Sequence, residues 1–259
     1  MSLRRPVATV PSGEPVHWPP PLPIDANDLD RYATINLDSV ATIEAVRSKL
    51  PEFRNLLDHL PEDGRGISLD VILMHHAPTR GAPQRNDGTR ERGHVIRSQT
   101  TILRMLEQMQ PKILGVEGYS YERVTPASIK GRNILNGSRT LPLGLEPEQA
   151  DGPITNACSS FILCHPDMFA IGTEDDDVFD LHYHALMKWA WNKTDEWEWT
   201  FTCRAAKLRS VIALSQILRA ARSRPPSEAV IVIGAGHRTE LEAMMLYAGI
   251  AGRIFDASK

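Results

Sequence analysis

The chain has 259 residues, of which 42% are hydrophobic and 24% charged, and its formal net charge is −3. The length suffices for one large domain or two small ones with a full hydrophobic core. The near balance of charge gives no electrostatic reason to expect nucleic acid or an anionic membrane as a partner. The three cysteines form no Cys-x-x-Cys pair, which argues against a disulfide framework and a thiolate zinc site. A reducing, cytoplasmic environment fits this cysteine usage best.

The first 30 residues are interpreted as a proline-rich arm. Six prolines lie within residues 11–24, and such a segment favours an extended polyproline II conformation. We expect the arm to wrap around the domain or to contact a second subunit. A homo-oligomer formed through the arm is therefore one of the alternatives. The arm contains no apolar run of signal-peptide length, and the chain holds no run of 18 apolar residues, so we expect no membrane span.

Residues 31–259 are predicted to form a single α/β domain. The second half of residues 31–60 has helical periodicity, residues 80–93 form a polar loop, and a helical insertion is expected around residues 125–166. Short apolar runs predict strands at 67–76, 111–119, 167–177, 229–237 and 253–257. Helical patterns occupy 94–110, 156–164, 178–192, 196–222 and 239–249. This alternation predicts a mostly parallel sheet flanked by helices.

Polar side chains follow four of the predicted strands. His75 and His76 end the first strand, Glu117 ends the second, Glu174 ends the third and His237 ends the fourth. In open parallel sheets, ligands bind outside the carboxyl ends of the strands. We therefore expect the site at these ends, although each histidine alone is explained equally well as a solvated loop residue.

Two imidazoles and two carboxylates in one cleft suit either of two chemistries. They can bind a divalent metal ion such as Zn, Mn or Co, or perform metal-free acid–base catalysis. Gly234 and Gly236 allow the backbone to turn sharply and to approach a ligand. The helix that begins near Thr239 would direct N–H groups at an anion or oxyanion in the same cleft.

The segments "VIGAGHRTEL" (232–241) and "HVIRSQTTILRMLEQMQPKILGVEGYSYE" (94–122) carry a family resemblance. They are similar to the superfamily that joins the TraB and Tiki proteins, the ChaN-like haem-binding proteins and the erythromycin esterases. The resemblance brings His94 and Gln99 into consideration beside Glu117.

Two further positions bear on this resemblance. Arg209, in "KLRSVIALSQIL", corresponds to the arginine that this group tends to carry before its last strand. Leu73 stands where the first motif of the group has a glycine, three residues before its histidine. His75 and His76 are therefore both candidates for that histidine.

The resemblance implies a hydrolase of an ester or amide bond in a small-molecule or peptide substrate. The four strand ends, taken with the resemblance, give as catalytic candidates His76 (or His75), Glu117, His237, Glu174 as a further ligand or proton shuttle, and Arg209. His94, Arg238, Gly234 and Gly236 would contact the substrate. Arg209 and Arg238 would bind a substrate anion or the developing oxyanion. A metal ion, if one is used, would be held by His75 or His76, Glu117 and His237.

Two alternative functions stay open. One is a haem- or iron-binding protein of the ChaN-like type, with histidine ligation and apolar contacts from Trp189, Trp191, Trp197 and Trp199. Those tryptophans are otherwise interpreted as a small satellite core. The other is an interaction module without catalysis that uses the proline-rich arm. His182 is interpreted as part of a solvated helix face, and Cys158 as a buried residue without a chemical role.

Overall fold

A computed structural model of the protein describes residues 25, 29–36, 66–75, 88–129, 157–179, 182, 196–224 and 228–257, with the backbone alone at 34–36, 88–93, 96 and 196–204. Several sequence-based predictions lie outside these residues. They concern His76, the proline-rich arm, the periodic stretch up to residue 60, residues 130–156 of the insertion, the helix at 178–192 apart from residues 178, 179 and 182, and the tryptophan side chains.

The described residues contain one seven-stranded sheet with the order β1-β7-β2-β6-β3-β5-β4. Its strands are β1 (Ala33–Asn36), β2 (Ser68–Met74), β3 (Ile113–Ser120), β4 (Arg123–Val124), β5 (Phe169–Glu174), β6 (Glu228–Gly234) and β7 (Arg253–Asp256). The five strands from β7 to β5 are parallel to their neighbours, and only the edge strands β1 and β4 pair antiparallel. The expected mostly parallel sheet is therefore confirmed.

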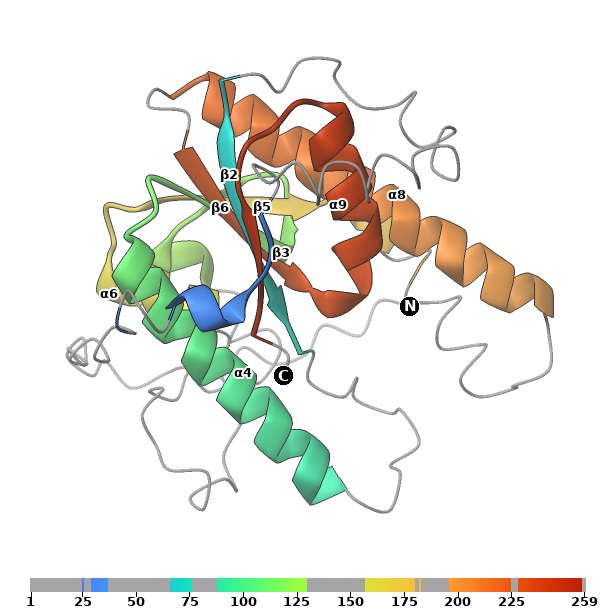
Figure 1. Ribbon diagram of the computed structural model, residues 1–259, viewed down its shortest axis with the longest axis horizontal. Helices are drawn as coiled ribbons and strands as arrows, with labels where there is room; N and C mark the ends of the chain where they lie inside the picture. The colour runs from blue at the N-terminus through green and yellow to red at the C-terminus, as the bar shows by residue number, and fades with distance from the viewer. Residues whose placement is uncertain are drawn as a thin grey trace, which may run out of the picture.

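Helices cover both faces of this sheet (Figure 1). The long helices are α4 (Gly88–Met109), α6 (Ala157–Cys164), α8 (Glu196–Arg222) and α9 (Arg238–Tyr247). Two short 3₁₀ helices are η1 (Asp30–Tyr32) and η4 (Ala235–His237), and the described residues 126–129 and 176–179 are also helical. Because α4 and α6 pack on one face and α8 and α9 on the other, the sheet is covered on both sides and the α/β fold class holds.

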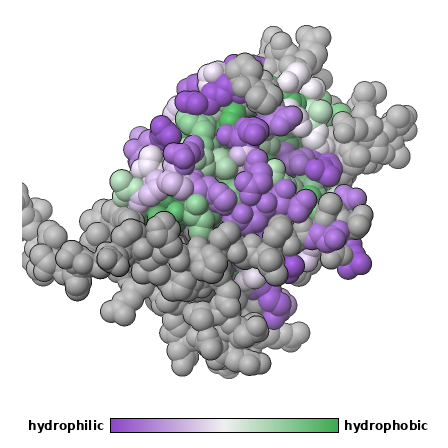
Figure 2. Space-filling model, turned by 90° about the vertical axis from the view of Figure 1, so that its left-hand side faces the viewer, coloured by the Kyte–Doolittle hydropathy of each residue, from purple (hydrophilic) through white to green (hydrophobic). Residues whose placement is uncertain are grey.

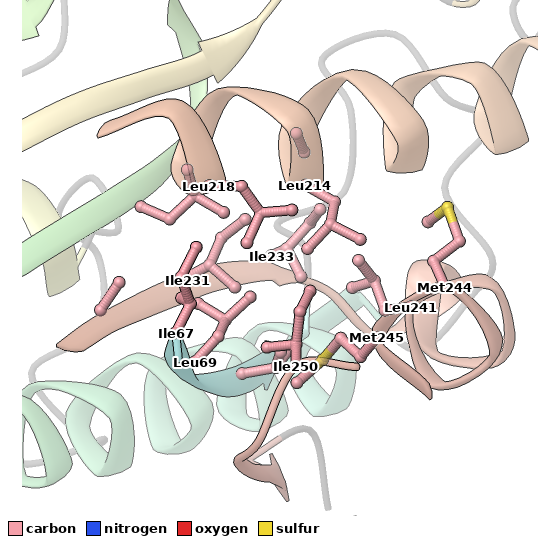
Figure 3. Packing of buried hydrophobic residues seen from close by; sticks show 14 of the residues in the cluster. Ile67, Leu69, Leu214, Leu218, Ile231, Ile233, Leu241, Met244, Met245 and Ile250 are labelled. Atoms are coloured by element: carbon pink, nitrogen blue, oxygen red, sulfur yellow. The ribbon is translucent and has the colours of Figure 1, made fainter. Parts of the chain in front are cut away.

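The strands are buried on both faces because their side chains alternate between two cores. On β2, Leu69 and Leu73 pack with α8 and α9, whereas Ile72 packs with α4 and α6. Figure 3 shows the first of these cores, where Leu214 and Leu218 of α8 lie over the sheet near α9. Near-continuous apolar strands are typical of parallel sheets covered on both sides, which explains why the sequence pattern predicted them.

Several elements differ from the sequence-based prediction, among them the two-residue edge strand β4, which was not predicted. The helix expected to start at His94 begins at Gly88, inside the stretch predicted as a polar loop. Its first turns, "GTRERG", carry no apolar residue that could mark a helical stripe. The edge strand β1 was not predicted, because four residues paired on one side only leave a weak pattern.

A bulge interrupts the pairing of β3 with β5 near the carboxyl ends of both strands. Val116 pairs with Gly172 and Ser120 with Glu174, so β3 uses four residues where β5 uses two. Gly118 has φ +83°, a conformation that side chains rarely adopt. Gly172 lies directly below the bulge, and a Cβ there would stand 1.8 Å from the carbonyl oxygen of Ser120.

The surface of the described part is mixed in character. In Figure 2 the coloured residues are mostly hydrophilic on the face shown, with smaller hydrophobic areas between them. Among the described residues, no helix is long and apolar enough to cross a membrane.

Candidate functional site

Three of the predicted strand ends meet in one buried network of hydrogen bonds. Its members are Glu117 from β3, Glu174 from β5, His237 from η4 after β6, and Arg209 and Ser210 from α8. Because β6, β3 and β5 are adjacent and parallel, their carboxyl ends lie side by side at one edge of the sheet. All five residues are less than 9% exposed, so the network is buried.

Arg209 holds the two carboxylates of the network together. Its Nη2 donates to Oε1 of Glu117 at 2.7 Å and also to Oε1 of Glu174, and its Nε donates to Oε2 of Glu174 at 3.0 Å. Its Nη1 donates to Nδ1 of His182 at 2.9 Å, and the guanidinium lies over the ring of Phe179 at 5.1 Å. The planar guanidinium thus joins two strand ends and the segment that follows β5.

Glu117 uses both of its carboxylate oxygens. Oε1 accepts from Arg209 and lies 3.6 Å from Nε2 of His237, and Oε2 accepts the backbone N–H of Gly234 at 2.6 Å. Bulges next to functional sites commonly redirect a side chain. Here the bulge of β3 begins at Glu117, the residue that contacts the end of the neighbouring strand β6.

His237 is held through its other ring nitrogen. Its Nδ1 lies 2.7 Å from Oγ of Ser210, which is fully buried in the middle of α8. The same Oγ contacts the carbonyl oxygen of Ala206 at 3.2 Å. The imidazole therefore has a fixed orientation between α8 and β3, with Nε2 on the side of Glu117.

The electrostatics of the network favour a charged arginine and a neutral cysteine. Burial alone would lower the pKa of Arg209, but hydrogen bonds and the charges of Glu174 and Glu117 outweigh it and raise that pKa. Burial raises the pKa of Cys158, the second residue of α6, and the charge of Glu117 raises it further. The ionised network therefore carries two negative charges and one positive charge before His237 is protonated.

Among the described residues, the predicted metal ligands do not form a metal site, although Glu117 and His237 lie 3.6 Å apart. There, no group of three or more His, Cys, Asp or Glu side chains is arranged to hold a metal ion. Both oxygens of Glu117 already accept a hydrogen bond, so a cation there would share the carboxylate with Arg209 and the N–H of Gly234. His76, which was one of the predicted ligands, lies outside the described residues, so its role stays a prediction.

The histidines near β2 lie beside each other. His75 follows β2 and its backbone N–H donates to Oγ of Ser98 at 3.0 Å, while its ring lies 6.4 Å from the ring of His94. Arg97 donates to Nδ1 of His94 at 3.0 Å. Gln99 has a structural contact, since its Oε1 accepts the first N–H of α6, from Ala157, at 2.8 Å.

The remaining predicted residues have defined surroundings. Arg238 donates to Glu242 at 2.6 Å and lies 3.8 Å from Asp256, on the side of β7. Gly234 reaches Glu117 through its backbone N–H, which any residue except proline would also provide. At Gly236 a Cβ would meet nothing within 4 Å, so the described chain does not itself require glycine there. Their predicted contacts with a substrate stay predictions.

Two members of the network were missed by the sequence interpretation. Ser210 follows Arg209 in an apolar helical stripe, and the only signal was two adjacent polar residues where the helix is otherwise buried. His182, which contacts the network through Arg209, was interpreted as solvated, but it is half-buried and its Nδ1 accepts a hydrogen bond from Arg209. No pattern in the sequence links residues 27 positions apart in this way.

Comparison with known proteins gives no match. No protein family matches the chain, and neither a curated protein nor a solved structure is significantly similar to it.

Proposed function

We propose that this protein hydrolyses an ester or amide bond, with His237 as the general base that activates water. The observation that carries the proposal is the buried imidazole of His237 at the carboxyl edge of a parallel sheet, with Nε2 3.6 Å from Glu117 and Nδ1 2.7 Å from Ser210. A general base must be oriented and must be stabilised once it is protonated. The resemblance to the TraB, ChaN-like and erythromycin esterase superfamily supports the same chemistry.

The charge of the network supports proton uptake by His237. Glu117 and Glu174 contribute two negative charges, and Arg209 contributes one positive charge. Protonation of His237 brings the sum to zero, so the imidazolium forms next to a compensating charge. In this mechanism His237 takes a proton from water, Glu117 stabilises the resulting cation, and Arg209 holds both carboxylates in place.

The hydrogen bonds of Arg209 favour catalysis without a metal. The guanidinium occupies the positions on Glu117 and Glu174 that a divalent cation would otherwise take. We therefore propose the metal-free form of the reaction first, with the metal-dependent form as its alternative. Elemental analysis of the purified protein, followed by activity with EDTA and with added Zn, Mn or Co, separates the two.

A substrate screen tests the proposal. The purified full-length chain is assayed on activated esters of increasing acyl length, on macrolactones and on peptides, beside His237→Gln and Glu117→Gln. A general base contributes about 10²–10⁴-fold, so we expect His237→Gln to lose at least about 100-fold in kcat. The control is His165→Gln, because His165 pairs with Glu107 beside the carboxyl end of α6, away from the network. Full activity of a folded His237→Gln protein would refute the proposal.

One observation favours haem or iron binding as a second candidate function. The rings of His75, which follows β2, and His94, in α4, lie 6.4 Å apart, and both residues are half-buried. Histidine is a common axial ligand of haem iron. Haem is titrated into the wild-type protein and into His75→Ala and His94→Ala; a Soret shift that both variants abolish supports haem binding, and no shift at micromolar haem contradicts it.

A further inference from the structure

Ser210 shares its hydroxyl between a carbonyl group and a histidine ring. Its Oγ lies 3.2 Å from the carbonyl oxygen of Ala206, one turn earlier in α8, and 2.7 Å from Nδ1 of His237. Ser210 is fully buried and His237 is 5% exposed, so water does not compete for these contacts. The two contacts together determine where the protons lie.

The hydroxyl has one proton, and the carbonyl oxygen can only accept. If Oγ donates to Ala206, it must accept from the ring, and Nδ1 of His237 must carry a proton. If Oγ instead donates to Nδ1, the carbonyl of Ala206 loses its contact with the hydroxyl. Of the two arrangements, the first satisfies both contacts of the hydroxyl, and it leaves the lone pair of neutral His237 on Nε2, the nitrogen that lies 3.6 Å from Oε1 of Glu117.

We propose that Ser210 is the positioning residue that fixes neutral His237 as the Nδ1–H tautomer, so that Nε2 is its basic atom. The proposal rests on the proposed function only for the use of that atom as a base. In serine hydrolases a buried carboxylate performs the corresponding task, and loss of the correct tautomer there is costly in kcat. Here the task falls to a hydroxyl that donates its own hydrogen bond to a helix carbonyl.

This arrangement also distinguishes Ser210 from a nucleophile. A catalytic serine must be exposed to its substrate and must give its proton to the base. Ser210 is fully buried in a helix, its proton is directed to Ala206, and it contacts the nitrogen opposite to the one near Glu117. Ser210 therefore acts through His237 and does not form a covalent intermediate.

Nitrogen NMR of the full-length protein tests the tautomer directly. Long-range 1H–15N spectra show which ring nitrogen of each of the nine histidines carries a proton. Comparison with His237→Gln assigns the signals of His237, and the pH is raised until its ring no longer titrates. We expect a protonated Nδ1 and a bare Nε2 in the wild type and in Ser210→Thr, which keeps the hydroxyl. In Ser210→Ala we expect the proton to move in part to Nε2.

The outcomes separate this proposal from the proposed function. A wild-type His237 with its proton on Nε2 overturns the inference, as does a Ser210→Ala protein with an unchanged tautomer. If Ser210→Ala does not fold, Ser210→Cys takes its place, because the thiol fills the site but hydrogen-bonds weakly. Once a substrate is known, we expect kcat of Ser210→Ala to fall about 100-fold at an unchanged KM, with recovery in Ser210→Thr. A correct tautomer in a protein without hydrolase activity refutes the proposed function alone.

Discussion

Replacement of Arg209 by methionine is the sharpest test of the buried network. Methionine keeps most of the apolar stem of the side chain and removes the guanidinium. Glu117 and Glu174, whose side chains are 3% and 5% exposed, then share a dry site without a cation. The variant therefore isolates the charge compensation from the packing of α8 on the sheet.

The magnitude follows from the hydrogen bonds that are lost. Arg209 makes three hydrogen bonds to the carboxylates, each worth about 1.5–3 kcal/mol. Part of this sum is offset because the guanidinium no longer has to be buried. Removal of one partner from a buried ion pair costs about 3–5 kcal/mol, and we expect Arg209→Met to lower the free energy of unfolding by that amount.

Urea denaturation at pH 7 measures this loss. With a slope of about 2 kcal/mol per molar urea, the midpoint should fall by about 1.5–2.5 M. Without the guanidinium, a buried carboxylate is more easily protonated than one in the unfolded chain, so the difference from the wild type in the free energy of unfolding should narrow as the pH falls from 7 to 5. A control that adds Glu117→Gln and Glu174→Gln to Arg209→Met should recover much of the stability. A loss below about 1 kcal/mol, or a gap that widens toward pH 5, would refute the reasoning.

Three further predictions concern stability. Gly172→Ala places a Cβ 1.8 Å from a carbonyl oxygen of β3, so it should lower the free energy of unfolding, measured by urea denaturation, by about 3 kcal/mol. The control is Gly236→Ala, whose Cβ would meet no atom within 4 Å and whose free energy of unfolding should stay within about 0.5 kcal/mol of the wild type. Burial raises the pKa of Cys158, so the thiol ionises at lower pH in the unfolded chain than in the folded one. Between pH 7 and 10 the free energy of unfolding of the wild type should therefore fall by about 2 kcal/mol relative to that of Cys158→Ala. Equal pH dependence of the two unfolding free energies would contradict this. Glu107→Gln removes the carboxylate that lies 3.0 Å from Nε2 of His165 and should cost about 1–3 kcal/mol in thermal unfolding at pH 6, an expectation that an unchanged Tm would exclude.

The sheet was predictable because its strands are short and apolar on both faces. The run "AVIVIG" is buried along β6, and its polar end at His237 marks the carboxyl edge as the pattern predicted. Glu117 and Glu174 followed from the same reasoning, since the carboxyl ends of parallel strands meet at one edge. Arg209 entered through the family resemblance alone, since periodicity does not identify the partner of a buried carboxylate.

The contacts between distant segments were not predictable. Ser210 lies in an apolar helical stripe, and only the packing of α8 beside η4 brings it to His237. His182 resembles a solvated residue until Arg209 approaches it from α8. The bulge in β3 depends on the positive φ of Gly118, and a single glycine after Glu117 does not predict a bulge from sequence. Each of these features depends on tertiary packing, which a local sequence pattern does not predict.

The bulge also separates the position of Glu117 from the register of the sheet. Below it, Ile113–Val116 pair regularly with both neighbouring strands, and above it Ser120 rejoins β5 two residues out of step. Insertions or deletions within the bulge of β3 would therefore move the carboxylate of Glu117 relative to His237, while the regularly paired part of β3 stays in place. A change in the length of this bulge, by evolution or by protein engineering, can therefore alter the position of Glu117 without altering the rest of the sheet.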